Sequence, residues 1–136
     1  MIELEQYISI PPADAWEYLT QPNHIEKWWD AHATLQPWKK GAFTCTWDDG
    51  TEARGFITAF DAGKRLQMDY KEPALQQETR VEFLFSPEDA GTRLYFQHSG
   101  WNALTDEKLR NAVVDEKTKA WENVLKRFAR YCAEHI

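Results

Sequence analysis

His98 is the residue of this sequence best suited to proton chemistry. It follows Leu94 and Phe96 in an alternating run, so its side chain is expected on the apolar face of a strand. General acid or base catalysis would need a second titratable group directed at the same space. The neighbouring carboxylates are expected at strand ends or on polar strand faces: Glu52, Asp69, Glu78 and Glu82. The sequence therefore predicts no catalytic pair, and it leaves His98 as a hydrogen-bonded core residue, the commoner role, or as a polar contact for a ligand.

The other histidines and the cysteines do not form a ligand set. His24, His32 and His135 are scattered, with no i, i+4 pair and no carboxylate at ligand spacing, so no metal site is predicted. Cys45 and Cys132 lack the spacing of a metal knuckle or a redox pair and are expected to be reduced core thiols. The sequence has neither a serine-hydrolase elbow nor a glycine-rich phosphate loop, and no cofactor is predicted.

Aromatic residues form the second group with functional potential. Residues 24–29 read His-Ile-Glu-Lys-Trp-Trp, and Trp38 follows shortly after. Each large ring can bury about 150–250 Å², so such a cluster fills a core, lines a cavity or forms a contact surface. Trp28 and Trp29 would point about 100° apart on a helix, so one can face inward while the other lies along a cavity rim. Core filling is the commoner role for any single ring.

The N-terminal elements are a strand and two short helices. Residues 2–10 alternate between apolar and polar types, which predicts a half-buried strand that Pro11-Pro12 ends. A short helix is expected over 13–19. Pro22 breaks the helical geometry before it and restarts a second short helix, which runs through Trp29.

The remaining elements are strands and one long helix. Turn residues divide residues 34–99 into strands, and Asp49-Gly50 predicts a hairpin between 42–47 and 52–60. The segment from Thr105 to about Glu134 has no proline or glycine. Its apolar residues form a stripe at helical spacing: Leu109, Val113, Trp121, Val124, Leu125, Phe128 and Cys132. The predicted fold class is α+β: a curved antiparallel sheet of about six to seven strands wrapped around this helix. All 136 residues are expected to form a single domain (1–136).

Composition and charge restrict the classes of partner. Hydrophobic residues make up 43% and aromatic residues 14% of the chain, which favours a packed globule over a disordered chain. The net charge of −6 disfavours nucleic acid as a partner, because phosphate binding requires clustered Lys and Arg. No apolar run approaches the roughly 20 residues that cross a bilayer, and the first residues do not resemble a signal peptide. We therefore expect no membrane span and a cytoplasmic location.

Several short motifs, taken in order along the chain, resemble those of one protein family. They are Ile10-Pro11-Pro12-Ala13-Asp14-Ala15-Trp16, Leu19-Thr20-Gln21-Pro22, Lys27-Trp28-Trp29, Gly55-x-Ile57 before Arg65-Leu66, Thr92-x-Leu94 leading to His98-Ser99-Gly100-Trp101, and Trp121-x-x-x-Leu125. Together they resemble the SRPBCC (START-like, helix-grip) superfamily, and within it the domains related to the activator of heat-shock protein 90 ATPase. The resemblance implies a cavity between sheet and helix, with the two short helices closing one end. Ala120 stands where the family often has glycine.

The leading functional prediction is a non-enzymatic domain that binds a small apolar or amphipathic molecule in this cavity. The residues expected to contact the ligand are Trp28, Phe43, Cys45, Met68, Tyr70, Phe83, Phe96, His98 and Trp121. The same rings could instead meet and leave no void. One alternative is a protein-interaction module resembling the chaperone activator, with an exposed patch around Trp29, Trp38 and Trp101. Another is a cyclase- or hydrolase-like enzyme of the same superfamily, and a homodimer is a further possible assembly.

Overall fold

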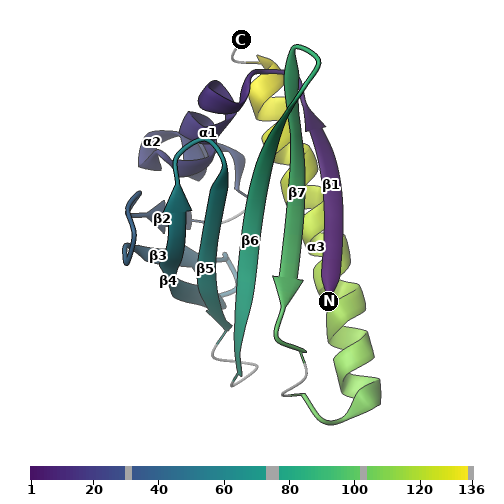
Figure 1. The fold of residues 1–136 in the computed structure, drawn as a ribbon. Coiled ribbons are helices and arrows are strands. Elements are labelled where there is room, and N and C mark those ends of the chain that lie inside the picture. Colours follow the sequence, from purple (N-terminus) through teal and green to yellow (C-terminus); the bar gives the residue numbers. More distant parts are fainter. Residues whose placement is uncertain (30–31, 73–76, 102–103, 135–136) are drawn as a thin grey trace.

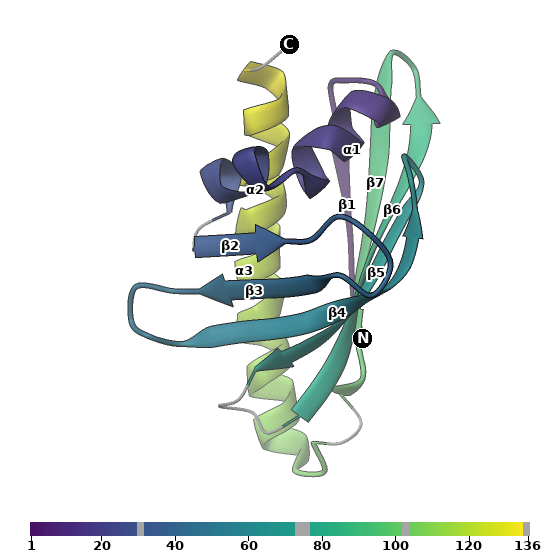
Figure 2. The same ribbon diagram turned by 90° about the vertical axis from the view of Figure 1, so that its left-hand side faces the viewer.

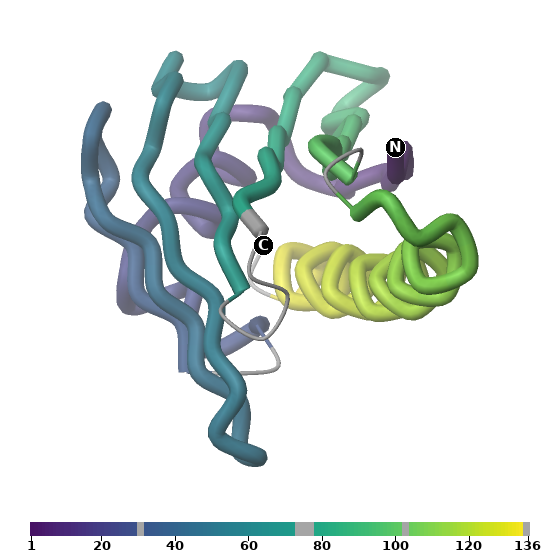
Figure 3. Tube along the Cα trace, turned by 90° about the horizontal axis from the view of Figure 1, so that it is seen from below, coloured from purple at the N-terminus to yellow at the C-terminus, as the bar shows by residue number. Residues whose placement is uncertain are grey.

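One curved antiparallel sheet and a long helix across its concave face dominate the computed structural model (Figures 1 and 3). The structure describes residues 1–29, 32–72, 77–101 and 104–134. The strands are β1 (Ile2–Ile8), β2 (His32–Leu35), β3 (Ala42–Thr46), β4 (Glu52–Asp61), β5 (Arg65–Glu72), β6 (Gln77–Glu88) and β7 (Gly91–Ser99). The helices are α1 (Pro12–Thr20), α2 (Pro22–Trp28) and α3 (Glu107–Glu134). The expected architecture, including two short helices after the first strand, is confirmed.

The sheet has seven strands in the order β1-β7-β6-β5-β4-β3-β2, and every neighbouring pair is antiparallel. From β2 to β7 each strand pairs with the next one in sequence, whereas β1 pairs with the last strand, β7. Helices α1 and α2 carry the chain from β1 at one edge to β2 at the other. They lie against the C-terminal half of α3 (Figure 2), so they close one end of the space between the sheet and α3.

Two prolines make the elbow between α1 and α2. Pro12 and Pro22 each occupy the first helical position, where the missing N–H breaks no intrahelical bond. Gln21 lies between the helices with extended backbone angles (φ −78°, ψ 131°), as expected for a residue that precedes proline. Trp29, the residue after α2, is also extended. The rings of Trp28 and Trp29 remain in contact, with 5.2 Å between their centroids.

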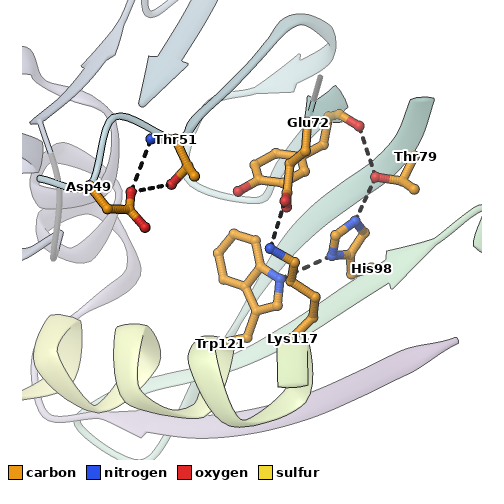
Figure 4. Close-up of polar contacts among 8 residues, drawn as sticks. Asp49, Thr51, Glu72, Thr79, His98, Lys117 and Trp121 are labelled. Atoms are coloured by element: carbon orange, nitrogen blue, oxygen red, sulfur yellow. Dashed lines mark hydrogen bonds and ion pairs between the residues drawn. The ribbon is translucent and has the colours of Figure 1, made fainter. Parts of the chain in front are cut away.

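The hairpin expected at residues 42–60 forms between β3 and β4. Asp49 accepts hydrogen bonds from the backbone N–H (2.9 Å) and the hydroxyl (2.6 Å) of Thr51 (Figure 4). These bonds lower the pKa of Asp49. Farther along β4, Gly55 passes so close to β5 that a Cβ atom would overlap the carbonyl oxygen of Asp69. A bulge between Ile57 and Ala59 then shifts the register of this pair, which helps the sheet to curve.

Helix α3 buries only its C-terminal half. Asp106 caps its start by accepting a hydrogen bond from the N–H of Leu109 at 3.1 Å. The buried residues of α3 are Trp121, Val124, Leu125, Phe128, Tyr131 and Cys132. The sequence placed Leu109 on the buried stripe, and this prediction is wrong, because its side chain is 52% exposed. The first turns of α3 extend beyond the end of β1 in Figure 1, where the sheet no longer covers them.

Candidate functional site

A chain of hydrogen bonds joins α3 to three strands around His98, which is fully buried (Figure 4). Trp121 on α3 donates from Nε1 to His98 Nδ1 at 3.0 Å. On the other side of the ring, His98 Nε2 lies 2.6 Å from Thr79 Oγ1 on β6. The Thr79 hydroxyl in turn donates to the carbonyl oxygen of Tyr70 on β5 at 2.8 Å. The polar side chain that the sequence places on an apolar face is therefore satisfied by its neighbours.

The partners of His98 determine its tautomer. An indole N–H can only donate, so Nδ1 must be the acceptor and the imidazole proton sits on Nε2. Nε2–H then donates to Thr79 Oγ1, and the single hydroxyl hydrogen of Thr79 remains for the carbonyl of Tyr70. In this series of hydrogen bonds each group donates to the next, from Trp121 to the carbonyl of Tyr70. A proton added to Nδ1 would face the N–H of Trp121.

Electrostatics also keep His98 neutral. Burial is the main cause that lowers the pKa of His98 from 6.5 to about 3, and the positive charges of Lys117 and the chain's amino terminus add to the effect. The imidazole is therefore a fixed hydrogen-bonding group at neutral pH. It fixes the ring of Trp121 directly, and through Thr79 it ties to the backbone carbonyl of Tyr70.

Aromatic rings fill most of the space between the sheet and α3. The Trp121 ring contacts Phe96 (4.5 Å between ring centroids), Tyr70 (5.7 Å) and Trp29 (5.7 Å). Trp29 also contacts Phe43 at 5.3 Å. These edge-on and tilted contacts are the arrangements that aromatic quadrupoles favour. The rings expected to face one interior do so.

A small pocket remains where these rings approach α3. Its volume is about 40 Å³, and it is lined by Trp29, Trp47, Tyr70, Lys117, Ala120, Trp121 and Val124. A water molecule takes up about 30 Å³ in the liquid, whereas typical ligand sites measure roughly 300–1,000 Å³. In this conformation the pocket thus holds a molecule no larger than about one water. The sequence left two alternatives, an open cavity and a core that the rings fill. The structure is closer to the filled core.

Lys117, which lines this pocket, forms an ion pair with Glu72 (Figure 4). Lys117 Nζ on α3 is 2.6 Å from Glu72 Oε2 at the end of β5, and the two side chains are only 22% and 11% exposed. The other carboxylate oxygen, Glu72 Oε1, is buried and has no hydrogen-bond partner among the described residues. The same is true of Nε1 of Trp29. An unpaired buried donor or acceptor costs about 1–3 kcal/mol, so both atoms favour a further polar partner.

All nine expected ligand contacts are buried, and all of them except His98 belong to one hydrophobic cluster. Tyr70 and Trp121 line the pocket itself. Six others are buried around it without lining it: Phe43, Cys45, Met68, Phe83, Phe96 and His98. Trp28 is placed differently, because it packs on Phe128 and donates from Nε1 to the carbonyl oxygen of Tyr18 at 2.8 Å. Its neighbour Trp29, the residue after α2, lines the pocket.

Five lining residues were not among those contacts: Trp29, Trp47, Lys117, Ala120 and Val124. The alternation in β3 continues from Phe43 and Cys45 to Trp47, so this ring could have been included. Lys117 precedes Trp121 by one helical turn and therefore lies on the same side of α3. From sequence alone, a lysine in a helix is usually assigned to the solvent-exposed face. The ion pair with Glu72 shows that the Lys117 side chain instead turns toward the sheet.

The structure also bears on the expectations for the cysteines, the tryptophan patch and a membrane span. Both cysteines are buried thiols outside any disulfide, as expected. Of the patch suggested around Trp29, Trp38 and Trp101, only Trp38 is exposed (54%), so these residues do not form one exposed surface. His135 lies outside the described residues. No described helix is both long and apolar enough to cross a membrane.

One protein-family model matches most of the sequence. Residues 9–133 match the model of the family described as "Activator of Hsp90 ATPase homolog 1-like protein". The chain belongs to this family. No curated protein matches the sequence significantly.

Solved structures share the fold at low sequence identity. Protein MLL2253 from Mesorhizobium loti has a TM-score of 0.85 and 22% identity, over 99% of this chain and 98% of that one. The Aha1 dimer from Colwellia psychrerythraea has a TM-score of 0.75 and 18% identity, over 91% and 89%. CalU16 from Micromonospora echinospora has a TM-score of 0.71 and 21% identity, over 96% and 74%. These likenesses establish the fold, which is compatible with a ligand-binding or an interaction domain.

Proposed function

We propose that this protein binds a compact, mainly apolar molecule in the pocket between the sheet and α3, without catalysing a reaction. One observation carries the proposal: Trp29, which lines this pocket, has a buried N–H without a partner among the described residues. Core tryptophans normally satisfy this group, as Trp28, Trp101 and Trp121 do. A ligand atom that accepts this hydrogen bond would remove the penalty.

Ligand binding requires the pocket to widen. Trp47 lines it and is partly exposed, so its side chain can turn toward solvent without opening the core. The walls on the opposite side cannot move as easily, because His98 holds the ring of Trp121, on which the ring of Tyr70 packs. Burying about 200 Å² of apolar ligand surface would contribute roughly 5 kcal/mol before association costs.

Filling the pocket mouth provides a direct test. Ala120 lines the pocket but is itself exposed, so Ala120→Leu adds volume at the mouth without disturbing the core. Ala112→Leu makes the same change at an exposed position of the same helix and is the matched control. Native mass spectrometry of freshly purified protein should find a bound small molecule on wild type and on Ala112→Leu, and less on Ala120→Leu. Equal retention by both variants would count against this pocket.

Self-association through the outer face of the sheet is the second candidate. The Phe56 side chain on β4 is 60% exposed beside an open hollow of about 380 Å³, where Gly55 and Ala42 contribute little bulk. Exposed aromatic rings are typical anchors of protein interfaces. Sedimentation equilibrium should then detect dimers that Phe56→Ser weakens and Leu109→Ser, at an exposed position of α3, does not. A wild-type monomer at high concentration would exclude this candidate.

The remaining alternatives have weaker support. A chaperone contact is suggested by the family description, and exposed Trp38 is the side chain of the expected patch still accessible to a partner. For an enzyme, the side chains hydrogen-bonded to the His98 ring are Thr79 and Trp121, and neither is a base at neutral pH. We keep the cytoplasm as the proposed location, because two buried thiols that form no disulfide suit a reducing compartment.

A further inference from the structure

A second hollow lies outside the ring-filled core, where α2 meets the last turns of α3 (Figure 2). Its volume is about 180 Å³, and the residues that line it are Lys27, Trp28, Arg127, Arg130, Tyr131 and Glu134. The last four are spaced at i, i+3, i+4 and i+7 in α3, so they share one side of this helix. We propose that the hollow binds the phosphate group of a small soluble molecule. This site is separate from the pocket of the proposed function.

The hollow is positively charged, although the chain as a whole is negative. Lys27, Arg127 and Arg130 contribute three positive charges to its lining. Glu134 contributes the one negative charge, so the lining has a net charge of +2 against −6 for the whole chain. All three cations are exposed, and none of them is ion-paired with a described carboxylate. They are therefore available to a single anion in the hollow.

The fold holds one of these cations in position. Arg127 donates from Nε to the backbone carbonyl oxygen of Trp28 at 2.9 Å, and this bond joins α3 to the end of α2. It restricts the plane of the guanidinium group, while the two terminal nitrogens keep their N–H donors. A planar guanidinium can donate two parallel hydrogen bonds to the oxygens of a phosphate or carboxylate. Arg127 is thus preorganised to bind an oxyanion.

The charges favour a small phosphate over other anions. A phosphate monoester carries a charge of about −1.5 to −2 near pH 7, which matches the +2 of the lining, whereas a carboxylate carries a single charge. Nucleic acids and anionic membranes extend beyond the hollow, and the net charge of −6 would repel them. A soluble phosphate monoester needs to contact only the hollow.

Titration of the ¹⁵N-labelled protein with inorganic phosphate at constant ionic strength tests this site. The amide signals of Lys27, Arg127 and Arg130 should move together, and acetate should bind about threefold more weakly or worse. Arg130→Gln removes one cation from the hollow and should weaken phosphate binding about threefold. Lys119→Gln makes the same change of charge at an exposed position of α3 outside the hollow and should change nothing. Glu134→Gln removes the opposing carboxylate and should tighten binding about twofold.

Three other outcomes would overturn the inference. If phosphate moves none of these signals, the cations act only within the protein, as Lys27 does by offsetting the negative C-terminal end of α2. If acetate binds as tightly as phosphate, the ligand class is wrong. If Arg130→Gln and Lys119→Gln weaken phosphate binding equally, phosphate responds to the overall charge of the protein and not to the hollow. Both of these side chains are exposed, so the two variants are expected to fold.

Discussion

The stability of this protein should fall steeply below pH 6.5 because of His98. The residue is fully buried, and its pKa is about 3 in the folded protein against 6.5 in the unfolded chain. Between these two pH values His98 is protonated in the unfolded chain and neutral in the folded protein. The free energy of unfolding therefore decreases as the pH drops below 6.5, and this decrease ends near pH 3.

The magnitude follows from proton linkage. Each pH unit well inside this window costs about 1.4 kcal/mol. Between pH 7.5 and pH 5.0, the contribution of His98 comes to about 2 kcal/mol of lost stability. That loss is a substantial share of the roughly 5–15 kcal/mol by which small domains are stable.

Urea unfolding followed by tryptophan fluorescence would measure this loss at pH 7.5, 6.0 and 5.0. In His98→Gln the amide can accept from Trp121 and donate to Thr79 without titrating, so the difference between the two proteins isolates His98. Wild type should lose about 2 kcal/mol more than His98→Gln across this range. Equal losses would refute the assignment of a neutral, buried imidazole. An NMR titration of the wild-type imidazole that shows no protonation down to pH 4.5 would support it independently.

Three further substitutions should each lower the free energy of unfolding. Gly55→Ala places a methyl group against the carbonyl of Asp69 and should cost more than about 3 kcal/mol, measured by thermal unfolding. Thr79→Val leaves Nε2–H of His98 without an acceptor, and we expect a loss of about 1–3 kcal/mol in urea unfolding. Phe96→Ala removes a fully buried ring that packs on the aromatic core and should cost about 3–5 kcal/mol by the same method.

Much of the fold could be predicted because its signals are local. Alternation along the strands, Pro12 and Pro22 at the helix starts, and Asp49-Gly50 in the hairpin each act within a few residues. These signals also assign the rings to one face of the sheet. They do not give the distance between that face and α3.

The candidate site was predicted less completely, because its geometry depends on contacts between residues that are far apart in the sequence. The choice between Trp28 and Trp29 depends on how α2 ends, and the extended backbone of Trp29 turns its ring to the pocket. The pairing of Lys117 with Glu72 joins residues from α3 and β5, and no pattern in either segment indicates it. Whether rings leave a void depends on packing at the scale of single atoms, which composition does not determine.

A crystal structure of the protein grown with cyclopentanol would test the central proposal most directly. We predict density for the alcohol between β5 and α3, with its oxygen at hydrogen-bonding distance from Trp29 Nε1 and with Trp47 turned outward. Alcohol bound only on the outer face near Phe56, with the rings of Trp29, Tyr70 and Trp121 unmoved around a closed pocket, would contradict it.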